Sequence, residues 1–186
     1  MKVIVDIGAN IGLFSISVCL RFPHARILAF EPHPENNDFL QRNVRQNKLN
    51  NVEIIKCAVG AKSGKSELYQ SEYNSGDHRL YRSGVNLKSK IYTSVITIDE
   101  YCEKENITKI DLIKIDVQGA EAAVIAGMGR ILGRGGVARI IIEYTPWMLK
   151  EAGSDPIKLL RDLESENFKL FILDEINEKI IAATPK

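Results

Sequence analysis

The stretch that decides the fold is VDIGANIG, from Val5 to Gly12, near the start of a chain of 186 residues. It reads as a short apolar strand interrupted by an acid, Asp6, and followed by a turn with Asn10 between two glycines. Gly8 lets the backbone turn sharply, and Gly12 lets a following helix pack closely, so that N–H groups at the helix start face a ligand. The stretch therefore predicts a ligand site where the first strand passes into the first helix.

Apolar strand-like runs and helix-like runs alternate along the rest of the chain, which is typical of a parallel sheet covered on both faces. The expected parallel strands are residues 1–7, 25–31, 52–59, 111–116 and 138–144, with an antiparallel pair at 168–173 and 179–183. A β-hairpin is expected at 60–69, followed by a long polar loop at 70–90. We predict a single domain over residues 1–186 with a doubly wound, mostly parallel, seven-stranded α/β sheet, a β-hairpin insertion and an antiparallel C-terminal strand.

Composition narrows the classes of function. The net charge of +1 predicts no bulk attraction to nucleic acid or to an anionic membrane, and no apolar run reaches the roughly 20 residues of a membrane span. No secretory signal pattern is present, and three scattered cysteines fit neither a disulfide framework nor a zinc site. We expect a cytoplasmic protein without nucleic-acid partners.

Two classes of ligand compete for the VDIGANIG turn. A dinucleotide fingerprint requires glycine at its third and sixth positions, but counting from Gly8 these are Asn10 and Leu13. The pattern of an acid followed by spaced glycines instead resembles the first motif of class I methyltransferases, which bind S-adenosylmethionine. The Asp6 carboxylate suits the ammonium and sulfonium charges of that molecule. A strand–turn–helix with glycines for steric reasons alone is the plain alternative.

The second expected strand ends in AFEPHPEN, where Glu31 lies 19 positions after Gly12. An acid at this place can accept hydrogen bonds from both hydroxyls of a ribose. The plain alternative is a surface acid before a proline turn. By position, Ala58 and Val59 at the end of the third strand are expected to line an adenine pocket.

The longest informative stretch is IDLIKIDVQGAEAAVIAGM, residues 110–128. Together with VDIGANIG, FEPHPEN and AVGAKSGKSELY, it resembles the FkbM-type methyltransferases, whose fourth-strand signature is similar to KIDVEGAE. Gln118 stands where glutamate is common, which leaves a carboxylate role there in doubt. The resemblance implies methyl transfer from S-adenosylmethionine, most often to a hydroxyl of a sugar or another small natural product. The expected cofactor contacts are Asp6, Gly8, Ala9, Asn10, Gly12, Leu13, Phe14, Glu31, Pro32, Ala58, Val59, Asp116 and Gln118.

Methyl transfer to an alcohol also needs a group that removes a proton. Three candidates are Asp116 and Glu143, at the ends of neighbouring strands, and His78 in the polar loop. Each has a plain alternative, since an acid can cap the next turn and a lone histidine can be a solvated loop residue. Lys114, in a central strand, needs a buried partner, and we expect an ion pair with Glu143 or Asp6.

Several further expectations bound the function. Asp77 and Asp116 could contribute to a metal site, but no tight ligand cluster is evident and none is expected. The basic residues of the polar loop, Arg79, Arg82, Lys88 and Lys90, could contact an acidic acceptor or simply form a solvated face. The chain begins directly on the first strand, whereas many methyltransferases carry an earlier segment that covers the substrate. We expect either that this sequence is truncated or that the polar loop and a partner subunit, for example in a homo-oligomer, supply the cover. The alternative function is a non-catalytic nucleoside-binding module of the same fold.

Overall fold

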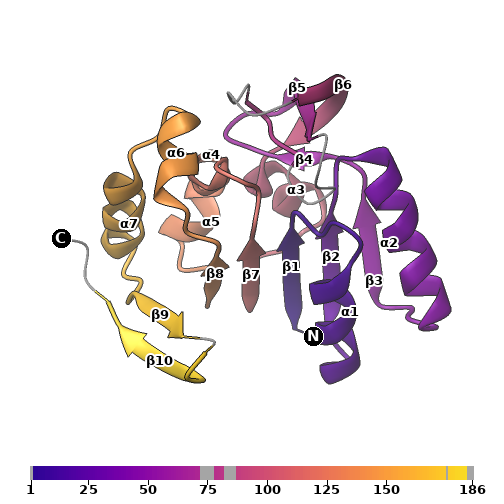
Figure 1. The fold of residues 1–186 in the computed structure, drawn as a ribbon. Helices are drawn as coiled ribbons and strands as arrows, with labels where there is room; N and C mark the ends of the chain where they lie inside the picture. The colour runs from indigo at the N-terminus through magenta and orange to yellow at the C-terminus, as the bar shows by residue number, and fades with distance from the viewer. Residues whose placement is uncertain (1, 72–77, 82–86, 175, 184–186) are drawn as a thin grey trace.

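The computed structural model describes residues 2–71, 78–81, 87–174 and 176–183. Five parallel strands form the central sheet in the order β3-β2-β1-β7-β8 (Figure 1). They are β1 (Val3–Ile7), β2 (Arg26–Phe30), β3 (Val52–Ile55), β7 (Leu112–Ile115) and β8 (Ile140–Ile142). The strand order reverses at β1, which has β2 on one side and β7 on the other, so the turn after β1 lies where such sheets bind ligands.

Helices cover both faces of the sheet because apolar residues point alternately to either side of each strand. Val5 and Ile7 of β1 pack with the helices of one face, α3 (Ile98–Lys104), α4 (Glu121–Ala126), α5 (Gly129–Gly133), α6 (Pro146–Glu151) and α7 (Pro156–Ser165). Ile4 packs against α1 (Leu13–Arg21), and Ala29 of β2 packs against α2 (Pro34–Gln46) on the opposite face. The doubly wound α/β architecture is therefore confirmed.

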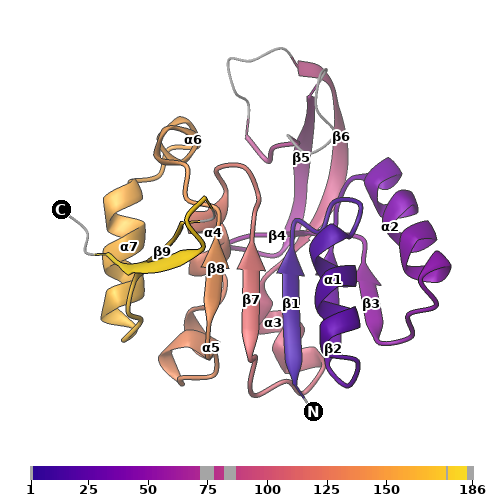
Figure 2. The same cartoon turned by 60° about the horizontal axis from the view of Figure 1, so that its bottom comes forward.

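The expected hairpin at residues 60–69 is wrong in its pairing. The structure forms a three-stranded sheet in the order β4-β6-β5, from β4 (Ala58–Val59), β5 (Gly64–Ser71) and β6 (Leu87–Ile96). Residues 60–63 carry the chain from one side of β6 to the other, so β4 pairs parallel and β5 pairs antiparallel with that strand. Figure 2 shows this small sheet standing above the carboxyl ends of the central strands.

The expected count of seven strands in one sheet is also wrong. The central sheet has five strands, and the C-terminal strands β9 (Phe171–Asp174) and β10 (Lys179–Ala182) form a separate antiparallel pair. Adjacent segments joined by a short turn close a small loop at little entropic cost, so the two strands bond to each other rather than extending the sheet at β8. Within the described ranges, no helix combines the length and the apolar character needed to cross a membrane.

Candidate active site

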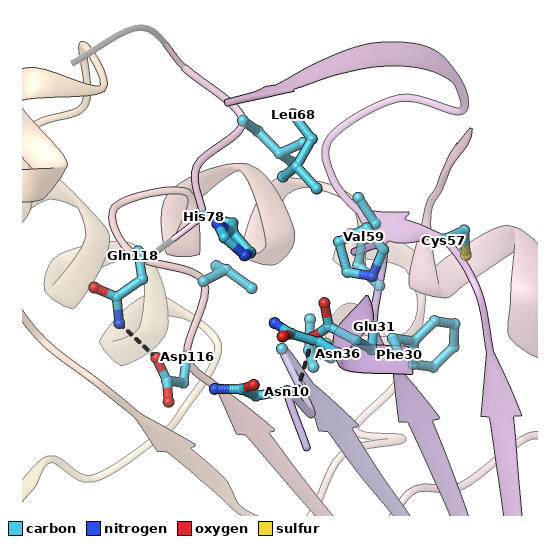
Figure 3. Close-up of a pocket in the computed structure, with 16 residues that line it drawn as sticks. Asn10, Phe30, Glu31, Asn36, Cys57, Val59, Leu68, His78, Asp116 and Gln118 are labelled. Carbon is cyan, nitrogen blue, oxygen red and sulfur yellow. Dashed lines mark hydrogen bonds between the residues drawn. The ribbon is translucent and has the colours of Figure 1, made fainter. Parts of the chain in front are cut away.

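A pocket lies at the carboxyl edge of the central sheet, beneath the small sheet (Figure 3). Its walls come from the ends of β1, β2 and β7, from β4 and β5, and from the segment 78–81. Nine residues that the sequence singles out line it together: Gly8, Asn10, Glu31, Pro32, Ala58, Val59, His78, Asp116 and Gln118. The fold therefore brings together positions that are more than a hundred residues apart in the chain.

An ion pair lies under the floor of the pocket. Asp6 of β1 is completely buried, accepts a hydrogen bond from the Ser15 hydroxyl at 2.6 Å, and lies 3.3 Å from the Lys114 ammonium. Lys114 also donates to the carbonyl oxygen of Gly8 at 2.9 Å and lies 3.2 Å from Asp116. The expected pairing of Lys114 with Asp6 is confirmed, and its cation ties the end of β1 to the end of β7.

The turn after β1 has left-handed backbone at three positions, with φ of 78° at Gly8, 51° at Asn10 and 92° at Gly12. A Cβ at Gly8 would lie 1.9 Å from the Asp116 carbonyl oxygen, so only glycine fits there. The side-chain oxygen of Asn10 is buried without a hydrogen-bond partner among the described residues. Because buried polar atoms are almost always satisfied, this oxygen fits a ligand that donates a hydrogen bond, such as an ammonium group.

Glu31, at the end of β2, is only 5% exposed. Its two oxygens accept hydrogen bonds from the backbone N–H groups of Asn10 and His33, each at 2.8 Å. Burial raises the pKa of this carboxyl, although those hydrogen bonds oppose the shift. A carboxylate has about four acceptor positions, and the Asn36 side chain occupies a third, so one position stays open to a ribose hydroxyl.

Asn36 is a pocket residue that sequence reasoning missed. It lies in the first turn of α2, is 4% exposed, and hydrogen-bonds to Glu31. The available signal is its helical position, because Asn36 lies one turn before Leu40 on the buried face of α2, which also carries Asn37 and Val44. A polar residue on an inward helix face is typical of a binding site.

The ends of β7 and β8 present a pair of carboxyl groups, Asp116 and Glu143. The side-chain amide of Gln118 donates to Asp116 at 2.9 Å and to Glu143 at 2.7 Å. Hydrogen bonding and the negative charge of Asp116, together with burial, raise the pKa of Glu143 to about 7. The pKa of Asp116 is lowered, because hydrogen bonds from its neighbours and the Lys114 charge outweigh its desolvation. The pair therefore places a proton acceptor that titrates near neutral pH beside the pocket.

The turn that presents these groups is held by Glu121, whose role the sequence did not reveal. Its buried carboxylate accepts from the backbone N–H groups of Val117 at 3.2 Å and Gly119 at 3.0 Å. Gln118 and Gly119 have φ of 54° and 104°, a conformation that needs such support. The signal is the acid of the GAE triplet, which follows this turn directly.

His78 lines the pocket on its nucleoside side. Its ring lies 4.0 Å from that of His33, centroid to centroid, and its Nδ1 accepts from the Ser71 backbone N–H at 3.2 Å. Its partners in these contacts come from the end of β2 and from β5 rather than from the carboxyl pair. His78 itself lines the pocket, whereas Glu143 lies beside it and is joined to Asp116 through the Gln118 amide.

The remaining expected contacts lie outside the pocket lining. Ala9 is buried and packs with α2, while Gly12 precedes α1 with its left-handed backbone. Leu13 is 78% exposed, and Phe14 packs against the core beneath α1. Asp77 and Arg82 fall outside the described residues. Among the residues that the structure describes, no group of three or more acidic, histidine or cysteine side chains is arranged to hold a metal ion.

The fold is a doubly wound α/β fold of the Rossmann-like type, and the site places acids at the ends of β1, β2, β7 and β8. The chain belongs to the FkbM methyltransferase family, since the model of the methyltransferase FkbM domain matches residues 6–170. The resemblance to this family that was read from the sequence is therefore confirmed. The chain spans about 60% of the length of a curated relative that it matches.

Two curated relatives and one solved structure illustrate the likeness. Methyltransferase sdnD of Sordaria araneosa is 30% identical over 67% of this chain and 60% of its own length. The 2-O-methyltransferase NoeI of Sinorhizobium fredii is 27% identical over 87% of this chain and 70% of its own length. The fold matches that of SMU.1697c of Streptococcus mutans, solved in complex with SAH, with a TM-score of 0.51, 11% identity, and coverage of 97% of this chain and 85% of that one.

Proposed function

We propose that this chain transfers a methyl group from S-adenosylmethionine to a hydroxyl oxygen of a sugar or another small natural product. The observation that carries the proposal is the carboxyl pair Asp116 and Glu143, with the pKa of Glu143 raised to about 7, at the edge of a pocket that also contains Glu31. The name of the relative NoeI, a 2-O-methyltransferase, supports an oxygen acceptor. A non-catalytic module would have no need of such a pair.

The described residues fit S-adenosylmethionine, which supplies an electrophilic methyl group when bound. Glu31 would accept a hydrogen bond from a ribose hydroxyl, and the apolar wall of Ala58 and Val59 would contact the adenine. The unpartnered oxygen of Asn10 would accept a hydrogen bond from the ammonium group. Asp6, buried and paired with Lys114, would support the turn from below. Gly8 leaves the floor open, because any side chain there would collide with the end of β7.

The chain's own contribution to the chemistry is to place the acceptor and take its proton. Glu143, oriented by the Gln118 amide, would accept the hydroxyl proton, which is worth on the order of 10² to 10⁴ in rate. Lys114 keeps Asp116 ionised, and that charge maintains the affinity of Glu143 for a proton near neutral pH. Good alignment of the hydroxyl oxygen with the methyl group lowers the activation barrier by roughly 7 to 11 kcal/mol.

Isothermal titration of the purified chain with S-adenosylmethionine and S-adenosylhomocysteine tests the cofactor assignment. Methyl transfer to a panel of glycosides and other small alcohols, followed with a labelled methyl group, tests the acceptor class. We expect binding of both nucleosides and transfer to oxygen. Binding without transfer to any hydroxyl would favour the non-catalytic module.

A further inference from the structure

An aromatic and charged group of residues lies outside the pocket lining, on the carboxyl-pair side of the site. We call it the acceptor wall, and its members are Arg79, Tyr81, Trp147 and Glu151. Its members come from the segment 78–81 and from α6. Figure 2 shows α6 above the carboxyl end of β8, the strand that leads to Glu143. The acceptor wall therefore stands on the opposite side of the site from Glu31.

Arg79 holds the acceptor wall together. It is only 3% exposed, and its guanidinium forms an ion pair of 3.0 Å with Glu151 at the end of α6. Its backbone exchanges two hydrogen bonds with Tyr69 of β5, at 2.8 and 3.0 Å. The same guanidinium lies 5.5 Å from the ring centroid of Trp147 and 5.7 Å from that of Tyr81. A buried cation with these partners fixes both aromatic rings to the small sheet.

Tyr81 connects the acceptor wall to the reacting groups. A Cβ built on Gly119 would lie 2.7 Å from the Tyr81 hydroxyl and 2.8 Å from the carbonyl oxygen of Met148. Gly119 follows Gln118, whose amide donates to Glu143. The ring of Tyr81 and the first turn of α6 thus meet at the turn that orients the proton acceptor.

Trp147 is the exposed member of the acceptor wall. Its side chain is 54% exposed although Arg79 and the first turn of α6 hold it in place. An indole ring has a negative face that attracts partly positive hydrogens, and it presents a large contact area at low entropic cost. An exposed, immobilised tryptophan four residues after the proposed base is typical of a surface that binds a ring.

We propose that Trp147 and Tyr81 are the binding platform for the acceptor, and that the acceptor is a pyranose sugar whose C–H face stacks on Trp147. This inference rests on the proposed methyl transfer. A sugar ring offers an apolar face to the indole and hydroxyl groups at its edge, which match the polar groups of Gln118, Glu143 and the Tyr81 hydroxyl. A flat aromatic acceptor would cover those polar groups without pairing most of them, at a desolvation cost.

The chain contains one tryptophan, so its fluorescence reports on this platform alone. We would titrate the protein, saturated with S-adenosylhomocysteine, with methyl β-D-glucopyranoside, methyl β-D-galactopyranoside, methyl α-D-mannopyranoside and, as a flat competitor, catechol. A saturable change in Trp147 fluorescence with at least one glycoside, and a weaker response to catechol, is the expected result.

A variant separates the platform from the cofactor site. Trp147→Ala should raise the KM for the responding glycoside about tenfold, with kcat nearly unchanged and the Kd for S-adenosylhomocysteine unaffected. Phe39→Ala is the matched control, since Phe39 is 51% exposed and lies 5.6 Å from an arginine guanidinium on α2. That control should leave the KM unchanged.

Three outcomes overturn the inference. In the first, the protein binds S-adenosylhomocysteine but its fluorescence does not respond to any glycoside. In the second, the fluorescence responds to catechol alone. In the third, the KM of Trp147→Ala for the glycoside is the same as that of the wild type. The proposed function fails separately, if calorimetry detects no S-adenosylhomocysteine binding at all.

Discussion

Lys114 of β7 and Asp6 of β1 are directly opposite one another in the parallel register, and their side chains form an ion pair of 3.3 Å at the carboxyl edge of the sheet. Asp6 is fully buried, whereas the side chain of Lys114 is 15% exposed and reaches the Gly8 carbonyl and Asp116 as well. One cation therefore stabilises the floor of the nucleoside pocket and sets the charge of the carboxyl pair.

Removing this cation should damage both stability and activity. Lys114→Met leaves the Asp6 carboxylate buried without its counter-charge, and we expect a loss of about 3 kcal/mol in the free energy of unfolding, measured by urea denaturation. Methyl transfer should fall below a tenth of the wild-type rate under conditions where the variant is folded. Lys158→Met removes an ion pair with both partners exposed, on α7, and should change stability by less than about 0.5 kcal/mol. Full activity in Lys114→Met would show that Lys114 has no role in methyl transfer.

Glu143→Gln tests the proton acceptor. We expect kcat to fall by about 10² to 10⁴ while the Kd for S-adenosylhomocysteine stays the same. In the wild type, kcat/KM should rise with pH through about pH 7, where Glu143 loses its proton, and the variant should lack this rise. A wild-type profile that is flat between pH 5 and 9 would contradict the assignment.

The same substitution has a predictable effect on stability. The pKa of Glu143 is about 7 when folded and about 4.3 when unfolded, so the folded state binds more protons between these values. The free energy of unfolding of the wild type should therefore decrease as pH rises through that window. Glu143→Gln lacks this contribution, and its stability relative to the wild type should increase from pH 5 to pH 8. The effect is small because the side chain is largely exposed.

Glu31→Gln tests the ribose contact. Each hydrogen bond from a hydroxyl to a carboxylate is worth about 1.5 to 3 kcal/mol, so the Kd for S-adenosylhomocysteine should rise at least about tenfold. The wild type should also prefer adenosine to 2′-deoxyadenosine, and the variant should lose most of that preference, as measured by calorimetry. Glu35→Gln, an exposed acid four residues away on α2, provides the control. Equal discrimination in Glu31→Gln would place the ribose elsewhere.

Gly8→Ala tests the close approach of β1 and β7. The added methyl would collide with the Asp116 carbonyl at 1.9 Å, at a backbone position with φ of 78°. We expect a loss of at least about 2 kcal/mol in stability and a loss of S-adenosylhomocysteine binding. Gly129→Ala, at the start of α5, meets nothing within 4 Å and should be neutral or stabilising by up to about 1 kcal/mol. Thermal unfolding of both variants would separate the two cases.

The sequence predicted the parts of the fold that local pattern determines. Continuous apolar runs identified all five parallel strands, and the glycine turn and Glu31 identified one edge of the pocket, because a doubly wound sheet brings strand ends together. The pairing of the strands was harder to predict from the sequence. The antiparallel pairing of β9 with β10 was predicted from the short turn between them and is confirmed. Neither the partner of β4 nor the separation of β9 and β10 from the central sheet can be read from apolar periodicity, which identifies strands but not their neighbours.

In the candidate site, too, some contacts were predictable from the sequence and others were not. Lys114 and Asp6 were predictable as a pair because a buried cation needs an anion nearby, and the structure confirms it. Three other contacts depend on how side chains point in tight turns and in the first turn of a helix. They are the hydrogen bonds from Gln118 to Asp116 and Glu143, the hydrogen bonds that Glu121 accepts, and the contact of Asn36 with Glu31. Those directions are set by tertiary packing, so residue spacing alone does not reveal them.

The acceptor wall is built from two segments outside the central sheet, and one of them, α6, contributes no residue to the pocket lining. Arg79 and Tyr81 belong to the insertion between β5 and β6, and Trp147 and Glu151 belong to one short helix. Exchanging α6 between family members should change acceptor preference without changing nucleoside affinity. Such an arrangement lets a lineage diversify its substrates while its methyl donor stays the same.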